Sequence, residues 1–249
     1  DFLNSHYIIM ATKKGQVKKT LLKAYSRPRT SGINAITINE DDELLEAKLT
    51  NGESQIILGA RSGMAIRFEE NKVRQMGRTA AGVRGISLQD ENDEVVGMVV
   101  VPDENRNVLV VSEKGYGKQT PVPEYRVTNR GGKGVKTINV SDKTGNLIAV
   151  KSVEGEEDLM IITRKGITIR MSIEGISVLG RNTQGVRLIR LKGKDEIASV
   201  AKVIADEEEE SVSPEGETPE DGLNNETDTA AENTDEAAGN MENDSTDDQ

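Results

Sequence analysis

The sequence predicts an all-β fold built from four successive repeats, and three observations predict this class. Glycines recur at a period near 50 residues, at Gly15, Gly63, Gly115 and Gly166. A β-branched run precedes each of these glycines, and a second glycine followed by Ile or Val comes 17 or 19 residues after each. Because a period of this length is typical of repeat architectures, the chain is interpreted as a modular array.

The first glycine of each repeat marks the turn of a predicted hairpin. The turns lie in T-K-K-G-Q-V, A-R-S-G-M-A, S-E-K-G-Y-G and T-R-K-G-I-T, after apolar runs at residues 8–10, 56–58, 108–111 and 159–162. Glycine is favoured in such turns because it adopts positive φ without a steric penalty. Each repeat therefore begins with two antiparallel strands.

Two further strands complete each repeat. The second glycines are Gly32, Gly82, Gly134 and Gly185, and apolar residues follow at one, four and six positions beyond each of them. A final apolar run closes each unit at residues 44–49, 95–101, 147–153 and 197–203. Four strands per repeat indicate a propeller-like blade, with blades expected at about 7–54, 55–106, 107–157 and 158–205.

Blades of this kind bury their faces only against neighbouring blades, so the array needs several of them. With 2% aromatic residues and no Trp, the core is expected to consist of Val, Ile and Leu. A single ordinary β-sheet protein is the alternative, and the four aligned copies argue against it.

The formal net charge of −11 conceals a basic domain. Residues 206–249 contain 18 Asp and Glu and no Lys or Arg; without them, 32 basic residues face 25 acidic ones, a net charge of +7 for residues 1–205. The C-terminal stretch has few large apolar residues, so it is predicted to be a disordered acidic tail. Its role is either solvation or competition with an acidic ligand for the basic domain.

The composition excludes several functions. There is no Cys, which rules out disulfides and thiol-ligated metals and fits a reducing cytoplasm. A single histidine, His6, cannot form a catalytic triad or a metal site by itself, and no residue cluster resembles an acid, base or nucleophile. We therefore expect no catalytic residue, no metal and no cofactor in this chain. No apolar run reaches the roughly 18 residues of a membrane span.

Basic residues recur at fixed positions of the repeat, which indicates a polyanion-binding rim. Four residues after the first glycine stand Lys19, Arg67, Gln119 and Arg170, with the basic residue Lys118 next to Gln119. Those in the loop before the second glycine are Arg29, Arg78, Arg130 and Arg181. Two residues beyond the second glycine stand Arg84, Lys136 and Arg187, with Asn34 in the first repeat. Regular guanidinium and ammonium groups suit regularly spaced phosphates, and scarce aromatics favour duplex over single-stranded DNA. The alternative is that these residues only solubilise strand edges.

The densest candidate site is N-R-G-G-K-G, residues 129–134. Here Arg130 and Lys133 would contact phosphates, while Gly131, Gly132 and Gly134 would let the backbone approach closely. A glycine-rich basic loop is a weak signal alone, and its position in the repeat strengthens it.

These segments resemble a known family, the C-terminal β-pinwheel domain of the DNA gyrase A subunit. The resemblance covers residues 7–205 and is carried by T-K-K-G-Q-V-K-K-T, M-G-R-T-A-A-G-V-R-G-I, E-K-G-Y-G-K-Q-T and V-L-G-R-N-T-Q-G-V-R-L-I. Family domains commonly have six blades, so the chain would hold the last four. The family's hallmark box, Q-R-R-G-G-K-G, is matched in part by residues 128–134 in the third repeat.

The resemblance implies that DNA wraps around the rim and that the parent enzyme, an ATP-dependent type II topoisomerase, introduces negative supercoils. It also implies partners, namely duplex DNA and, in an A2B2 complex, the core of the gyrase A subunit together with the gyrase B subunit. ATP and Mg²⁺ would be bound in that parent complex. The setting would be the bacterial cytoplasm, on the chromosome and away from membranes. Alternatives are the C-terminal domain of topoisomerase IV and a propeller-like protein-interaction scaffold.

Overall fold

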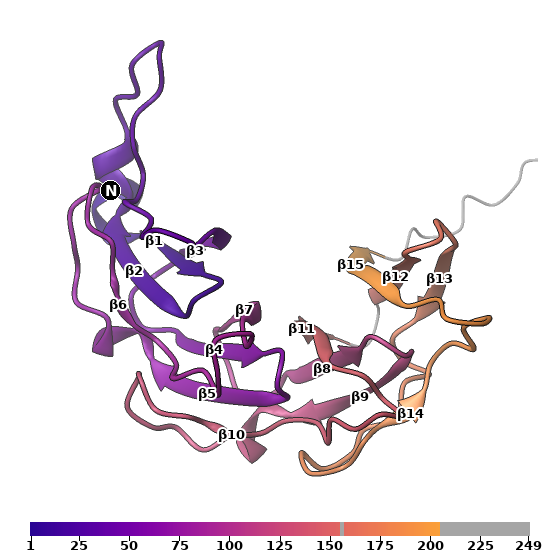
Figure 1. Cartoon of the computed structure of the whole chain (residues 1–249). Helices are drawn as coiled ribbons and strands as arrows, with labels where there is room; N and C mark the ends of the chain where they lie inside the picture. The colour runs from indigo at the N-terminus through magenta and orange to yellow at the C-terminus, as the bar shows by residue number, and fades with distance from the viewer. Residues whose placement is uncertain (155–156, 205–249) are drawn as a thin grey trace, which may run out of the picture. The chain divides into compact units, whose positions relative to one another are not determined.

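The computed structural model describes residues 1–154 and 157–204, and the predicted tail at 206–249 lies outside them. The described residues belong to one compact, all-β unit (Figure 1). Its strands are β1 (Tyr7–Thr12), β2 (Gln16–Leu21), β3 (Leu44–Thr50), β4 (Gln55–Ala60), β5 (Met64–Glu69), β6 (Val83–Arg84), β7 (Val95–Val101), β8 (Asn107–Ser112), β9 (Tyr116–Pro121), β10 (Val135–Lys136), β11 (Leu147–Val153), β12 (Glu157–Thr163), β13 (Thr168–Ser172), β14 (Val186–Arg187) and β15 (Ile197–Ile204). Short helical turns are α1 (Phe2–Ser5), η1 (Leu22–Tyr25), η2 (Glu70–Lys72) and η3 (Val122–Glu124). The predicted fold class is confirmed.

The four predicted hairpins are β1–β2, β4–β5, β8–β9 and β12–β13. Each first glycine has a φ between +81° and +83°. Its N–H donates to the carbonyl three residues earlier, as in Gly15 N to Thr12 O at 3.0 Å and Gly166 N to Thr163 O at 2.9 Å. The left-handed conformation explains why glycine stands at these turns.

Three of the sheets contain a strand from the following repeat. Their strand orders are β3-β1-β2-β6, β10-β5-β4-β7 and β11-β8-β9-β14, and Figure 1 shows β6 beside β2 rather than beside β5. The sequence period predicted four strands per blade, but it did not indicate that one of them crosses to the preceding sheet. In the described part of the chain, the last sheet has three strands in the order β13-β12-β15.

The first repeat differs from the sequence-based expectation. An apolar pattern at residues 33–38 predicted a strand, but the structure has none there. The equivalent segments of the later repeats become β6, β10 and β14 because each pairs with the hairpin of the preceding repeat. No described sheet receives the segment at 33–38, so it has no partner strand.

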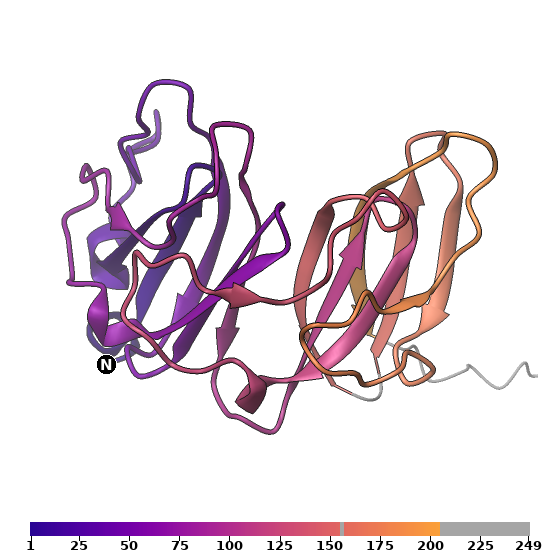
Figure 2. The same ribbon diagram turned by 60° about the horizontal axis from the view of Figure 1, so that its bottom comes forward.

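In the last three repeats, the second glycine is where the chain crosses to the preceding sheet, and Figure 2 shows these connections passing from one sheet to the next. Gly134 has a φ of +76°, and a Cβ there would lie 2.2 Å from the carbonyl oxygen of Ala65. At Gly82 and Gly185 the equivalent distances to a backbone oxygen are 2.6 and 2.5 Å. These contacts are too close for any side chain, so strand exchange itself requires glycine.

The core lies between successive repeats and is mainly aliphatic. On β4, Ile56 and Leu58 pack in a cluster with Ile9 of the first repeat. Between them, Ile57 points to the other face and packs with Val108 and Val110 of the third repeat. Because side chains alternate along a strand, one strand contributes core residues to the interfaces with both neighbouring repeats, as stacked blades require.

We predict that Gly134→Ala destabilises the chain more than Gly32→Ala. Both glycines have positive φ, +76° and +81°, but a Cβ at Gly32 has nothing within 4 Å. The change at Gly32 therefore costs only the backbone strain of about 1 kcal/mol, while the change at Gly134 adds a clash with Ala65 worth roughly 1–3 kcal/mol more. Urea unfolding measures both, and equal losses would contradict the close crossing.

Candidate nucleic-acid interface

Two of the predicted sets of basic positions meet at each boundary between repeats. The loop arginine of one repeat donates from Nη1 to the backbone carbonyl of the residue two beyond the second glycine of the preceding repeat. These contacts are Arg78 to Asn34 at 3.1 Å, Arg130 to Arg84 at 3.0 Å and Arg181 to Lys136 at 3.1 Å. These residues are 44 to 46 positions apart in the sequence, and the fold brings them together.

The backbone repeats this contact. The N–H five residues beyond the second glycine donates to a carbonyl in the next loop, and the three bonds are Thr37 to Ala80 at 3.3 Å, Ser87 to Gly132 at 2.9 Å and Asn139 to Thr183 at 3.0 Å. Each loop before a second glycine is therefore stacked on the segment after the preceding one. We call this continuous layer of loops the rim.

The R-G-G-K-G loop is engaged by the protein more than the sequence indicated. Arg130 is half-buried and donates from Nε to the carbonyl of Lys72 at 2.9 Å, besides its bond to Arg84. The N–H of Gly131 donates to the carbonyl of Gly85 at 2.6 Å. Only Lys133 presents an exposed ammonium group in this loop. Of the three glycines, Gly134 lies at the close backbone crossing. The N–H of Gly131 already has an acceptor within the protein, so it is not free to bind a phosphate.

Three predicted rim residues lie in the interior, and the expectation that they present charge at the surface is corrected. Lys19, Arg67 and Lys118 are 6%, 3% and 0% exposed. Arg67 donates from Nη1 to the carbonyls of Val122 and Tyr125, at 3.0 and 2.9 Å, and forms an ion pair with Glu104. The bonds to Val122 and Tyr125 join the second repeat to the third, so this guanidinium group is engaged by the protein itself.

The position four residues after the first glycine has the same role in each of the first three repeats. Lys19 Nζ donates to the carbonyl of Glu70 at 3.2 Å, and Gln119 Nε2 donates to the carbonyls of Ile173 and Ile176 at 2.8 and 3.0 Å. All the acceptors lie in the first helical turn or bend of the next repeat. Gln119, the one uncharged residue at this position of the repeat, lacks the charge but keeps the hydrogen-bond donor.

Lys118 is buried and binds the last rim loop, residues 180–183. Its Nζ donates to the carbonyls of Gly180 and Arg181, at 2.5 and 2.7 Å, and to Thr183 Oγ1 at 3.1 Å. Burial lowers the pKa of Lys118 to about 8, although Glu124 partly opposes this shift. Lys18 occupies the same position in the first repeat, where burial also lowers its pKa.

The remaining predicted residues lie at the surface. Exposed side chains are Arg29, Arg84, Lys133, Lys136, Arg170 and Arg187, while Arg78, Arg130 and Arg181 are half-buried. Arg170 pairs with Asp158, with Nε and Oδ2 at 2.6 Å. The rim therefore keeps an exposed cation at or near most of its repeat boundaries.

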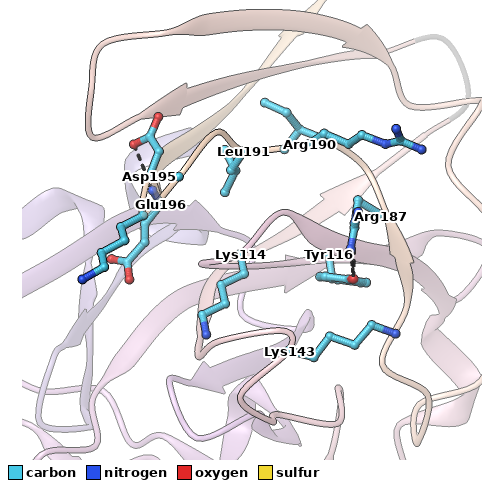
Figure 3. Close-up of a pocket in the computed structure, with 11 residues that line it drawn as sticks. Lys114, Tyr116, Lys143, Arg187, Arg190, Leu191, Asp195 and Glu196 are labelled. Carbon is cyan, nitrogen blue, oxygen red and sulfur yellow. Dashed lines mark hydrogen bonds between the residues drawn. The ribbon is translucent and has the colours of Figure 1, made fainter.

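A basic pocket between the third and fourth repeats was not predicted from the sequence. It has a volume of about 650 Å³, and its charged lining residues are Lys114, Lys143, Arg187, Arg190, Lys194, Asp195 and Glu196. Figure 3 shows Lys143 and Arg187 on opposite sides of Tyr116, with their cationic groups 5.4 and 5.3 Å from the ring centre. Tyr116 is 5% exposed, and its hydroxyl accepts a hydrogen bond from Arg187 Nη2 at 2.7 Å.

The equivalent hollow between the second and third repeats is less basic. It has a volume of about 620 Å³, and its charged lining residues are Arg61, Asp90 and Asp93. Asp93 is committed to the turn, because its carboxylate accepts hydrogen bonds from the N–H and hydroxyl of Ser62 at 2.9 and 2.8 Å. Positive charge is thus concentrated at particular boundaries.

Across residues 1–154 and 157–204, no three His, Cys, Asp or Glu side chains are grouped in a way that could hold a metal ion. None of the helices in that part of the chain combines the length and apolarity needed to cross a membrane.

These features define a repeat domain of the β-propeller class with a basic rim between its repeats. The chain belongs to the family described as DNA gyrase C-terminal domain, beta-propeller, whose family model matches residues 6–51, 54–102, 106–154 and 157–204. The resemblance predicted from the sequence is thereby confirmed.

Individual relatives agree with this family. The chain is 46% identical over 218 residues to the DNA gyrase A subunit of Staphylococcus aureus strain MRSA252, covering 87% of the chain and 24% of that relative. It is 47% identical over 214 residues to the same protein of strain NCTC 8325 / PS 47, covering 86% and 24%. The chain therefore spans about a quarter of the length of the curated relatives that it matches.

Solved structures share the fold. A crystal structure of the C-terminal domain of DNA topoisomerase IV matches with a TM-score of 0.77 and 26% identity, covering 82% of the chain and 64% of that domain. A DNA gyrase A C-terminal domain matches with a TM-score of 0.72 and 24% identity, covering 82% and 68%.

We predict that Lys118 makes the free energy of unfolding rise between about pH 8 and pH 10.5. In this window the folded chain has lost the Lys118 proton, whereas the unfolded chain retains it up to the ordinary pKa of 10.5. The unfolded state then binds more protons, so raising the pH favours folding. In urea unfolding, the free energy of unfolding of the unmodified chain should therefore rise relative to that of Lys118→Met as the pH increases. Parallel curves would contradict a lowered pKa.

Proposed function

We propose that this chain binds duplex DNA through its phosphates and bends it along the rim, as the C-terminal domain of a gyrase A subunit. The observation that carries the proposal is the repeated contact of a loop arginine with the segment after the preceding second glycine, found at three boundaries. It places cationic side chains of two repeats side by side at each later boundary. Family membership supports the same role.

The exposed cations are the proposed phosphate contacts. They are Arg29, Arg84, Lys133, Lys136 and Arg187 on the rim, joined by Lys114, Lys143 and Arg190 in the basic pocket. Arg78, Arg130 and Arg181 stabilise the loops and add charge beneath them. Bending 20–30 base pairs by 40–90° costs on the order of 1–6 kcal/mol, which several charge-assisted contacts offset.

In the parent protein, such bending would present a DNA crossing to the catalytic core. That core, together with a gyrase B subunit in an A2B2 complex, would use ATP and Mg²⁺ to pass one duplex through another and introduce negative supercoils. The present chain would supply DNA geometry and no catalytic residue. The proposed setting is the bacterial cytoplasm, where the chromosome lies.

The C-terminal domain of topoisomerase IV is the second candidate function. The solved topoisomerase IV domain supports it with the TM-score of 0.77, but its identity of 26% is well below the 46% shared with a gyrase A subunit. A scaffold that binds only proteins would give the exposed rim cations no ligand.

The decisive experiment measures wrapping directly. Closed circular plasmid is relaxed by a type I topoisomerase in the presence of the chain, and its linking number is then compared with that of a protein-free control. A displaced topoisomer distribution supports wrapping. An unchanged distribution at concentrations that saturate a gel shift would reduce the function to binding, and the absence of a gel shift would overturn the proposal.

We predict that Lys133→Ala and Lys136→Ala each reduce the slope of log K against log salt by about one. Each exposed ammonium would release one counterion equivalent on meeting a phosphate. The matched control is Arg106→Gln, because Arg106 already pairs with Asp103 and Glu154. Fluorescence anisotropy with several duplex sequences checks this result, and a loss confined to one sequence would indicate base recognition instead.

We predict that deleting residues 206–249 tightens DNA binding. Those residues carry 18 acidic side chains against a net charge of +7 for residues 1–205, so they would compete with phosphate for the rim. The difference should shrink as salt rises, because screening weakens both interactions. Equal affinities at low salt would leave solvation as the role of this segment.

A further inference from the structure

We propose that Glu46 is a positioning residue, which holds the first and third repeats together and thereby sets the curvature of the rim along which DNA would bend. The consequence for DNA rests on the proposed function. Glu46 lies on β3 of the first repeat, and its Oε1 accepts a hydrogen bond from Lys151 Nζ on β11 at 3.1 Å. The two residues are 105 positions apart, so this contact reaches past the second repeat.

The same carboxylate also binds the second repeat. Its Oε2 accepts a hydrogen bond from the N–H of Met98 on β7 at 3.0 Å, and it lies 3.3 Å from Lys48 Nζ on β3. Lys48 Nζ in turn donates to the carbonyl of Met98. One acidic side chain therefore has partners in three successive repeats.

Glu46 stands at a position of the repeat where the other repeats have small residues. The residues that pair with the position four before each first glycine are Glu46, Gly97, Ala149 and Ser199. Strands β3, β7, β11 and β15, which we call the inner strands, contain no other acidic residue. A Cβ at Gly97 would lie 2.8 Å from the carbonyl oxygen of Val150, so β7 and β11 approach closely here. This approach shortens the span that Glu46 has to bridge.

The two lysines that bind Glu46 occupy the same position of their repeats. Lys48 pairs with Ile9 and Lys151 pairs with Leu109, and both partners stand six residues before a first glycine. Burial disfavours the charged form of Glu46, but Lys48 and Lys151 hold its pKa below the usual range. Without the carboxylate, two partly buried ammonium groups would lose their shared counter-charge, which favours separation of the two repeats.

The inner strands and the rim lie at opposite edges of the sheets. In the first three sheets the edge strands are β3 and β6, β7 and β10, and β11 and β14, and Figure 1 shows β3, β7 and β11 on one side of the unit and β6, β10 and β14 on the other. Rim contacts such as Arg130 to Arg84 hold the outer edges together. With the outer edges joined, the separation of the inner strands determines the angle between sheets. Glu46 therefore sets how sharply bound DNA would turn along these repeats.

Pulsed electron paramagnetic resonance tests the contact without DNA. The chain has no Cys of its own, so spin labels are attached at Glu40→Cys and Asp142→Cys, two exposed sites in the turns before β3 and β11. We expect Glu46→Gln to lengthen the distance between the labels by about 3 Å, the width of one inserted water. The matched control is Glu157→Gln, because Glu157 is 21% exposed against 20% for Glu46 but pairs with Lys202 inside the fourth repeat. An unchanged distance in Glu46→Gln, or an equal increase in the control, would overturn the proposal.

The plasmid assay measures the consequence for DNA. We expect Glu46→Gln to reduce the linking-number change per bound chain and to leave the dissociation constant in a gel shift unchanged, because the rim cations are untouched. Lys151→Met should cause the same loss, and the double variant should lose no more than either single variant, because both changes remove one contact. Additive losses, or an undiminished linking-number change in Glu46→Gln, would overturn the assignment. If the unmodified chain displaces no topoisomers, the proposed function fails, while the label distance still decides whether Glu46 holds the repeats together.

Discussion

The close passage of Gly82, Gly134 and Gly185 over the preceding sheet is the constraint on which the other features depend. It lets a two-residue strand such as β10 pair with a neighbouring hairpin, and this pairing sets where the rim loops lie. The loop arginine and the carbonyl that it contacts are then fixed by the same crossing. A single unsubstituted Cα thus couples strand pairing, core packing between repeats and the position of the surface charges.

Basic side chains have two separate roles in this arrangement. Buried donors such as Arg67 and Lys118 bind backbone carbonyls of the next repeat and replace part of a hydrophobic interface. Exposed ones such as Lys133 and Lys136 form few contacts with the protein. The basic residues recur with one period in the sequence. Some of them stabilise the fold, and others are the proposed DNA contacts.

Much of the architecture could be predicted from periodicity, because hairpin turns and alternating apolar residues are local features. The glycine at each turn and the four repeats are examples. Which sheet receives β6 could not be predicted, since a period does not distinguish a strand's own repeat from its neighbour. The burial of Arg67 was hidden for a similar reason, because its acceptors at Val122 and Tyr125 lie over 50 residues away. The pocket around Tyr116 likewise exists only once β14 crosses to β9.

The contrast between the two hollows, one lined by Lys143 and Arg190 and the other by Asp90 and Asp93, has a consequence for how such arrays diversify. Since the repeats are joined by aliphatic packing and by buried side chains that donate to backbone carbonyls, the charge at the surface of each boundary can change without altering those contacts. Each repeat boundary could then be adjusted separately along the proposed DNA path. Single surface substitutions could therefore change the strength of DNA binding at one boundary without changing it at the others.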